Sequence, residues 1–417
     1  MFVSRMLGLS LRGATLASKF LLVIFLARYF SIDVMGQYAL FTASVSYALF
    51  IVGLDFYTFS SREILSSNDS KIQAKLIRDQ FVFYLISYVF VFPLLLIIFF
   101  YKLLPSSFIF WFYTLLILEH ISQELVRLLV VMKKNVLANL VYFIRAGSWV
   151  YISIGIMFFY VPGRSLDFIL LSWSIGGAVS ILISLYGLRS LSVFKLESSI
   201  NWIWMLQGIR VALPLLFGTL SLRAIYTADR YILQWFDSTS SVGIYGFYSS
   251  FSSALLAFID ATVVMQYYPR VVENFKCGNL EAYNIISKEF LRSIVFMGAF
   301  ISICLAVLMN VLPFFIGKPE YSNSIGVFYI LLSGAFVFAI SLVPHYQLYA
   351  QGRDFELILS SFMAFIGAIF SMFILGMYFG MPGVALGQFI GLVILAVSKY
   401  ICVLYGRNTV HVDAKKS

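Results

Sequence analysis

The chain has 417 residues, of which 61% are hydrophobic and only 12% are charged, and its formal net charge at pH 7 is +10. Apolar runs of about 20 residues, each long enough to cross about 30 Å of hydrocarbon, recur along almost its whole length and exclude a soluble globular protein. The runs are continuous rather than alternating, which excludes a membrane β-barrel. The sequence therefore predicts an all-α polytopic membrane protein, because each helical span satisfies its backbone hydrogen bonds internally.

The predicted elements are about twelve membrane-spanning helices. In chain order they cover residues 13–30, 37–57, 81–101, 108–128, 136–160, 167–187, 207–234, 243–266, 290–316, 325–350, 357–379 and 383–405. Cys277, Cys304 and Cys402 are too few and too scattered for a disulfide framework or a metal site, so no metal is expected.

The two longest polar breaks, residues 58–80 and 268–289, are mixed in charge, amphipathic and about half a chain apart. A second echo lies upstream of each break, where Tyr29-Phe30 and Gly36-Gln37-Tyr38-Ala39 correspond to Trp235-Phe236 and Gly243-Ile244-Tyr245-Gly246. These echoes predict two six-helix lobes, and an even number of spans in each half makes the repeats parallel. We expect an N-terminal lobe over 1–187, a cytoplasmic linker over 188–206, a C-terminal lobe over 207–405 and a cytoplasmic tail over 406–417.

The distribution of positive charge predicts the orientation. With a cytoplasmic N-terminus, the outside loops hold only Arg28, Lys102, Arg164 and Lys318, whereas the inside segments hold most of the other cations. This is the asymmetry that the positive-inside rule describes, and it places both termini in the cytoplasm. The net positive charge therefore needs no nucleic-acid partner to explain it.

Several cations interrupt the apolar spans, where a charge is costly and often marks a functional site. We expect Lys19, Arg145, Arg223 and Arg230 to line an internal cavity that binds an anionic substrate. Arg223 and Arg230 are seven residues apart, so they share one face of their helix. The alternative is a structural role, in which Lys19 and Arg230 snorkel towards an interface. Arg210 is interpreted as a topogenic charge at a cytoplasmic helix end.

The fourth predicted span carries Glu119, His120, Glu124 and Arg127. The last three follow i, i+4, i+7 spacing and form one polar stripe. The stripe has two interpretations, a proton or sodium relay or an internal ion-pair network that stabilises the N-terminal lobe. Asp229, next to Arg230 in sequence, is expected to hold that arginine by pairing across helices.

Two sequence motifs resemble the Wzx-type polysaccharide flippases of the multidrug/oligosaccharidyl-lipid/polysaccharide (MOP) exporter superfamily. The first is Ala228-Asp229-Arg230-Tyr231-Ile232-Leu233 followed by Ser240-Ser241-Val242-Gly243-Ile244-Tyr245, and the second is Leu26-Ala27-Arg28-Tyr29-Phe30 with Gly36-Gln37-Tyr38. Length, span number and the two-lobe plan extend the resemblance over nearly the whole chain. It implies an architecture like that of MATE and MurJ proteins.

The resemblance further implies a function. The protein would move undecaprenyl-diphosphate-linked O-antigen, or a related surface-polysaccharide repeat unit, across the bacterial inner membrane. Transport would run from the cytoplasmic to the periplasmic leaflet, by alternating access through a cationic central cavity. Its partners would be the lipid-linked glycan, membrane lipids, a polysaccharide polymerase and a chain-length regulator of lipopolysaccharide biosynthesis.

Competing functions differ in the residues that they require. No GxxxxGK[ST] phosphate loop occurs, since Gly317-Lys318 is followed by Pro319, so transport would be driven by H⁺ or Na⁺ or by consumption of the product, with no cofactor. We expect the protein not to be an enzyme. A multidrug or organic-ion antiporter of the same superfamily is the nearest alternative, but a cavity for cations should be lined by carboxylates. A membrane polysaccharide polymerase is a further alternative, and it would require a larger periplasmic loop.

Overall fold

The computed structural model describes residues 2–67, 69–189 and 199–413, and in these ranges every regular element is a helix. The first half of the chain contains α1 (Phe2–Tyr29), α2 (Ile32–Gly53), α3 (Tyr57–Ser66), α4 (Ser70–Leu95), α5 (Ile97–Phe100), the 3₁₀ turn η1 (Ser106–Phe108), α6 (Ile109–Val131), α7 (Asn135–Phe143), the π-helical turn η2 (Ile144–Ser148), α8 (Trp149–Phe159), the 3₁₀ turn η3 (Val161–Gly163) and α9 (Leu166–Leu188).

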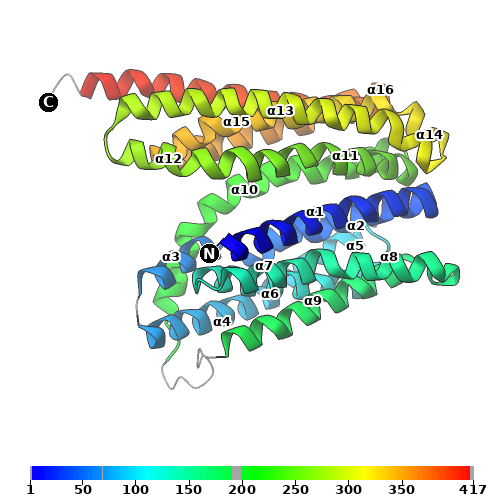
Figure 1. The fold of residues 1–417 in the computed structure, drawn as a ribbon, viewed down its shortest axis with the longest axis horizontal. Coiled ribbons are helices and arrows are strands. Elements are labelled where there is room, and N and C mark those ends of the chain that lie inside the picture. Colours follow the sequence, from blue (N-terminus) through cyan, green and yellow to red (C-terminus); the bar gives the residue numbers. More distant parts are fainter. Residues whose placement is uncertain (1, 68, 190–198, 414–417) are drawn as a thin grey trace. The chain divides into compact units, whose positions relative to one another are not determined.

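The second half begins with the long helix α10 (Trp202–Phe236) (Figure 1). It continues with α11 (Thr239–Ile259), the π-helical turn η5 (Asp260–Val264), α12 (Met265–Lys276), α13 (Leu280–Ile316), α14 (Pro319–Asn323), α15 (Ile325–Ala350) and α16 (Asp354–Asp413). Residues 190–198 of the expected linker and residues 414–417 of the expected tail lie outside the described residues.

Ten helices of the described chain are long and apolar enough to span a membrane. Helices α16 and α6 account for the difference between these ten helices and the twelve predicted spans. The segment α16 contains the last two spans, separated at Gly380, whose φ of 57° interrupts the helix. Helix α6 corresponds to the predicted span 108–128. It has 23 residues, but it is not among the ten because it carries Glu119, Glu124 and Arg127. The polytopic all-helical fold is thus confirmed, and the chain is a multi-pass membrane protein.

The second predicted span, 37–57, extends too far at its C-terminal end. Helix α2 ends at Gly53 because Leu54 and Asp55 adopt left-handed backbone conformations with φ of 47° and 49°. Side chains disfavour that region, so two such residues in succession stop the helix. The chain restarts at Tyr57 as α3.

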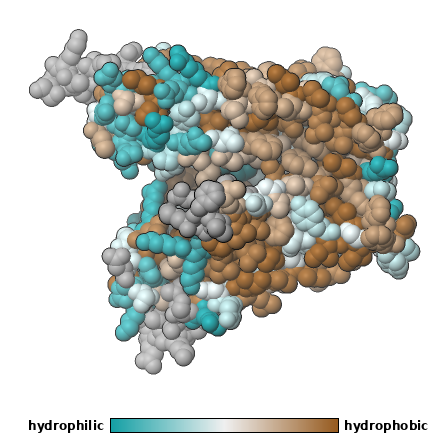
Figure 2. Space-filling view, in the orientation of Figure 1, coloured by the Kyte–Doolittle hydropathy of each residue, from teal (hydrophilic) through white to brown (hydrophobic). Residues whose placement is uncertain are grey.

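Both predicted polar breaks are largely helical. The first contains α3 and the start of α4, and the second contains α12 and the start of α13. Asp69 accepts a hydrogen bond from the backbone N–H of Lys71 at the N-terminus of α4, and Asn279 does the same for Ala282 of α13. Figure 2 shows hydrophilic residues gathered at this end of each unit, whereas the middle of the helices presents an apolar surface.

The chain divides into two compact units. Unit 1 comprises residues 1–30 and 40–216, and unit 2 comprises residues 31–39 and 217–417. The expected lobes of 1–187 and 207–405 differ from this division at two places. The first part of α10 belongs to unit 1, and the first turns of α2 belong to unit 2.

Packing explains both differences. At the start of α10, Trp204 packs edge-on against Phe56 with ring centroids 5.3 Å apart, which attaches this segment to unit 1. In unit 2, Ser240 donates a hydrogen bond to Asp33 at 3.0 Å. A Cβ atom at Gly36 or Gly243 would meet the backbone of Thr239 or Ile32, respectively. The two glycine motifs that the sequence aligned as a repeat therefore also serve as the close contact between α2 and α11.

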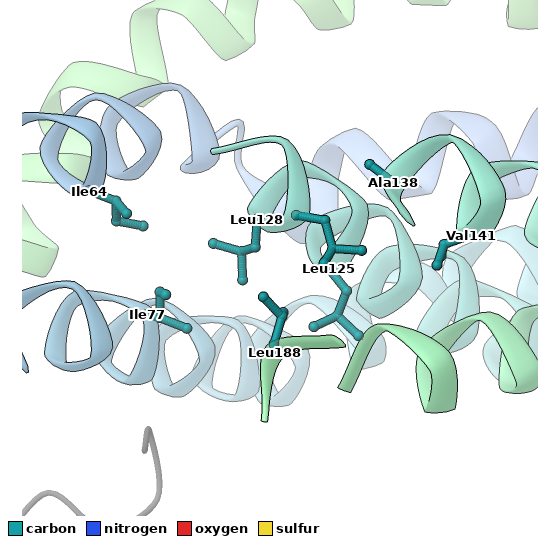
Figure 3. Packing of buried hydrophobic residues seen from close by; sticks show 8 residues of the cluster. Ile64, Ile77, Leu125, Leu128, Ala138, Val141 and Leu188 are labelled. Atoms are coloured by element: carbon teal, nitrogen blue, oxygen red, sulfur yellow. The ribbon is translucent and has the colours of Figure 1, made fainter. Parts of the chain in front are cut away.

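Buried apolar residues of unit 1 form a core beneath the amphipathic helix α3 (Figure 3). The cluster takes side chains from α3, α4, α6, α7 and α9, and its labelled members are Ile64, Ile77, Leu125, Leu128, Ala138, Val141 and Leu188. This core fixes α6 in position, and α6 presents the polar residues described next.

Candidate functional site

Helix α6 carries a buried carboxylate with several donors in unit 1. Glu124 accepts hydrogen bonds from Tyr84 Oη at 2.7 Å and Gln80 Nε2 at 3.0 Å, and it forms an ion pair with Arg127. The Arg127 guanidinium also lies over the Tyr57 ring, 3.4 Å from its centroid. These contacts join α3, α4 and α6 through buried polar side chains.

His120 belongs to the same face of α6, one turn before Glu124. Its Nδ1 lies 2.7 Å from the hydroxyl of Tyr88, whereas its buried Nε2 has no hydrogen-bond partner among the described residues. A Cβ atom at Gly53 would lie 2.9 Å from this Nε2, so the end of α2 packs directly on the ring. His120 is consequently held in place through one nitrogen only.

Glu119 faces a different direction and connects α6 with α9 and η2. It accepts a hydrogen bond from Trp173 Nε1 at 2.7 Å, and its other oxygen lies 3.7 Å from Arg145 Nε. The Trp173 ring stacks on Trp149 with an interplanar angle of 8°. Glu119 and Arg145, which were predicted as separate sites, form an ion pair in the fold.

Arg145 lies within the π-helical turn η2, a feature that is frequent at functional sites. Its side chain is 12% exposed, and its Nε and Nη1 atoms are buried without a hydrogen-bond partner among the described residues. A guanidinium has five N–H donors, and a single ion pair at 3.7 Å leaves most of them available. Arg145 thus retains donors for an anionic ligand.

Helix α1 packs against η2 and places a second cation in the same unit. Ser18 lies 3.5 Å from the carbonyl oxygen of Ala146, and the next residue, Lys19, is exposed. Lys19 forms no hydrogen bond or ion pair with any described residue. About two helical turns before Lys19, Arg12 donates to Asn139 at 3.1 Å. Lys19 and Arg145 therefore come from adjoining elements of unit 1.

The second pair of predicted cations lies on α10 in unit 2. Arg223 is exposed and acts electrostatically on Tyr226. Arg230 is mostly buried: it donates to the carbonyl oxygen of Tyr226 and, at 3.4 Å, to Ser249, while its Nε is buried without a partner in the described residues. Of the two, only Arg223 is exposed.

Asp229 is fully buried and accepts hydrogen bonds on both carboxylate oxygens. One oxygen accepts from the backbone N–H of Arg230 at 2.7 Å, and the other accepts from Tyr245 Oη at 3.0 Å and Gln388 Nε2 at 3.3 Å. Its ion pair with Arg230, at 3.7 Å, lies along the same helix. The expected pairing across helices is thus wrong for Arg230. The physical reason is that neutral donors from α11 and α16 occupy the side of the carboxylate that faces other helices.

A cavity of about 30 Å³ lies beside this cluster within unit 2. Its polar lining comes from Tyr226, Ser249, Ser252, Ser253 and Gln388. The Tyr226 hydroxyl is buried without a hydrogen-bond partner in the described part of the chain. A volume of this size accommodates about two water molecules, so the cavity is suited to hydrating this cluster rather than to admitting a glycan.

The structure contributes partners that the sequence analysis did not select. Gln80, Tyr84 and Trp173 complete the polar contacts of α6, and Tyr245 and Gln388 complete those of Asp229. Gln80 and Gln388 could have been selected from the sequence, because an amide inside an apolar span requires hydrogen-bond partners. Tyr84, Tyr245 and Trp173 could not have been selected, since the chain has 26 Tyr and 6 Trp distributed throughout.

Among the described residues, no group of three or more His, Cys, Asp or Glu side chains is arranged to hold a metal ion. The polar residues instead form two separate sets, each within one unit. Unit 1 holds the network around Glu124 and the Glu119–Arg145 pair, and unit 2 holds the network around Asp229. These carboxylates are all engaged by donors, whereas Arg145 keeps donors to spare.

The class of protein that this fold defines is a polytopic bundle of apolar helices, and several solved structures have a similar fold. The chain is similar to the lipid II flippase MurJ in its inward closed conformation, with a TM-score of 0.75 and 14% sequence identity, over 97% of this chain and 87% of that one. It is also similar to an inward-facing multidrug resistance MATE family transporter of the MOP superfamily, with a TM-score of 0.73 and 12% identity, over 97% and 96% of the two chains.

A third similar structure is the Vibrio cholerae MATE transporter VcmN in the bent form, with a TM-score of 0.56 and 14% identity over 96% of this chain and 97% of that one. No model of a known protein family matches the sequence, and no curated protein sequence matches it. These likenesses confirm the expected MATE-like and MurJ-like architecture. At such low identity they describe the fold.

Proposed function

We propose that this protein is a flippase of the MOP type that moves an undecaprenyl-diphosphate-linked glycan across the bacterial inner membrane. The substrate would be an O-antigen or related surface-polysaccharide repeat unit, carried from the cytoplasmic to the periplasmic leaflet by alternating access. Both termini would be cytoplasmic. A polysaccharide polymerase and a chain-length regulator would act on the product. The similarity in fold to a lipid II flippase supports this assignment.

The observation that carries the proposal is the set of unsatisfied donors on Arg145. A diphosphate crossing an apolar medium needs fixed cations to offset several kcal/mol of desolvation. Arginine supplies a bidentate fork and stays charged when buried. Arg145 has two buried nitrogens without a hydrogen-bond partner among the described residues, and the exposed Lys19 lies on the adjoining helix. Arg223 and Arg230 would supply further cationic contacts from unit 2.

Ion coupling would use a polar residue other than these cations. The candidates for H⁺ or Na⁺ coupling are Glu119, His120, Glu124 and Arg127 on α6, and Asp229 in unit 2. The dense hydrogen bonding of Glu124 and Asp229 favours a structural role for these two carboxylates. His120, with one nitrogen unpartnered in the described chain, is the better candidate for proton exchange.

A multidrug or organic-ion antiporter is the second candidate, and the similarity in fold to MATE transporters favours it. Such a protein would present carboxylates to its cationic substrate. In the described residues, Glu119, Glu124 and Asp229 are all engaged by donors. This favours an anionic substrate over a cationic one.

Deletion of the gene tests the proposal directly. We expect the strain to lose surface polysaccharide and to accumulate lipid-linked repeat units on the cytoplasmic face, with both effects reversed by the wild-type gene. The leaflet is determined by accessibility of the glycan to a membrane-impermeant lectin in oriented vesicles. Single units on the periplasmic face would identify a polymerase instead, and an unchanged glycan would favour the multidrug exporter.

Arg223 provides a second, milder test. Because Arg223 is exposed, its substitution by alanine should leave folding intact and remove one charged contact, worth about 1.5 kcal/mol or tenfold in transport. Arg223→Lys should restore part of the loss, since lysine retains the charge but not the fork. Surface polysaccharide is measured in the deletion strain at matched protein abundance. Normal display from Arg223→Ala would remove this residue from the substrate path.

A further inference from the structure

Unit 2 contains a buried lysine that none of the roles above uses. Lys399, in the last span of α16, is 2% exposed. It makes no hydrogen bond and no ion pair with any described residue. An isolated ammonium in an apolar interior is so costly that the side chain either finds a counter-ion or releases its proton. The described part of the structure provides Lys399 with no carboxylate, so release of the proton is the available response.

His345 on α15 is a second group near Lys399 that can accept a proton. Helices α15 and α16 run side by side: Gly334 packs against Leu392, and further along Arg353 donates to the carbonyl oxygen of Cys402 at 2.9 Å. His345 and Lys399 lie between these two contacts, near enough for the lysine to act electrostatically on the imidazole. The ring nitrogens of His345 form no hydrogen bond with a described residue, and its ring packs edge-on against Tyr346.

Other charged groups on the packed elements are already engaged or exposed. Arg353 is paired with Glu356 at 2.9 Å, and Asp260 in η5 is exposed and acts on Tyr346. Helix α11 carries no charged residue. Further titratable groups on these elements include the phenols of Tyr267, Tyr268, Tyr283, Tyr346, Tyr349 and Tyr400 and the exposed side chains of Lys288, Glu289 and Arg292.

We propose that Lys399 and His345 hold a single exchangeable proton between them and that its uptake and release accompany transport of the anionic substrate. Two positive charges that act on each other inside a helical bundle oppose each other, so the ammonium and the imidazolium are not formed together. The proton leaves Nζ when a lone pair of the imidazole or of water accepts it, and charge is conserved at each transfer. Pro344, immediately before His345, leaves one carbonyl of α15 without its helical donor and gives this helix a point of bending.

The proposal rests on the proposed function for its link to transport, but the proton site can be tested without substrate. The thermal unfolding midpoint of the purified full-length protein in detergent is measured between pH 6 and pH 9. Burying the ammonium opposes folding more than burying the neutral amine, so Lys399→Met should unfold a few degrees above the wild type at pH 6. The difference should shrink as the pH rises. Lys399→Arg, which cannot release its proton, should unfold below the wild type throughout.

Lys288→Met is the matched control, because Lys288 is exposed on α13 of the same unit, and its difference from wild type should not vary with pH. His345→Gln should retain the pH-dependent difference but change the pH at which it occurs. A Lys399→Met midpoint that differs from the wild type by the same amount at every pH, or lies below it throughout, would overturn the proton site.

Coupling is tested in proteoliposomes that contain a pH-sensitive dye, with undecaprenyl-diphosphate-N-acetylglucosamine as the probe. The wild type should change the luminal pH as the probe moves, and Lys399→Met should move the probe with at least a tenfold smaller pH change. Movement of the probe by the wild type without a pH change would overturn the coupling. If the wild type moves no probe while the unfolding result holds, the proposed function fails and the proton site stands.

Discussion

Arg145→Ala is expected to reduce surface-polysaccharide display about tenfold to one hundredfold in the deletion strain. The reason is that two nitrogens of the Arg145 guanidinium are buried without a hydrogen-bond partner in the described chain. A charge-assisted hydrogen bond from such a donor to phosphate contributes about 1.5–3 kcal/mol. Arg145→Lys should restore only a fraction, because an ammonium is a point charge without the bidentate fork. Display is measured by lectin binding at matched abundance of the variants.

The substitution of Arg145 also leaves Glu119 without its ion-pair partner, so stability must be separated from binding. The double variant Glu119→Gln/Arg145→Ala removes both charges and should regain thermal stability while remaining defective in transport. Arg12→Ala is the matched control, since Arg12 is an exposed arginine of the same unit whose Nε donates to Asn139. Wild-type display from Arg145→Ala at wild-type abundance would contradict the role of this residue in binding the diphosphate.

Glu124→Ala is expected to lower the free energy of unfolding by about 3–5 kcal/mol, the cost of leaving a buried charge without its partner. The substitution removes the acceptor of Tyr84 and Gln80 as well as the ion-pair partner of Arg127. Glu124→Gln retains the shape and one acceptor and should cost less. The unfolding midpoint in detergent and the abundance of the protein in the membrane measure the effect.

Unit 2 offers a matched control for this prediction. Arg353 and Glu356 form an ion pair with the same i, i+3 spacing as Glu124 and Arg127, but Glu356 is 28% exposed whereas Glu124 is 1% exposed. An ion pair that water reaches contributes about 0–1 kcal/mol, so Glu356→Ala should have a small effect. Equal losses from the two substitutions would show that burial of Glu124 does not determine its contribution.

The helical spans could be predicted from the sequence because each depends on a local property. About 20 apolar residues that must satisfy their backbone hydrogen bonds have one solution in a membrane, and each of the twelve predicted ranges overlaps a helix. The end of α2 could not be predicted, because Leu54 and Asp55 are ordinary residues in left-handed conformations. Such a backbone is maintained by its surroundings rather than by its own preferences.

The candidate site could be predicted in its charged residues but not in their partners. Arg145 and Glu119 belong to different helices, and they come together because α9 packs against both α6 and η2. The interpretation of Asp229 failed for a related reason. Its partners Tyr245 and Gln388 are of common residue types, and their hydroxyl and amide groups matter only because α11 and α16 direct them at the carboxylate.

The sequence by itself determined the class of this protein: its apolar runs require membrane-spanning helices, and its intramembrane charges are too costly to be incidental. Tertiary structure alone decided which of those charges are neutralised. Glu124 and Asp229 are surrounded by donors, Arg145 retains free ones, and Lys399 is buried with no counter-ion in the described chain. The physical reason is that the cost of a charge in a membrane depends on the groups within a few ångströms of it, and those groups come from distant parts of the chain.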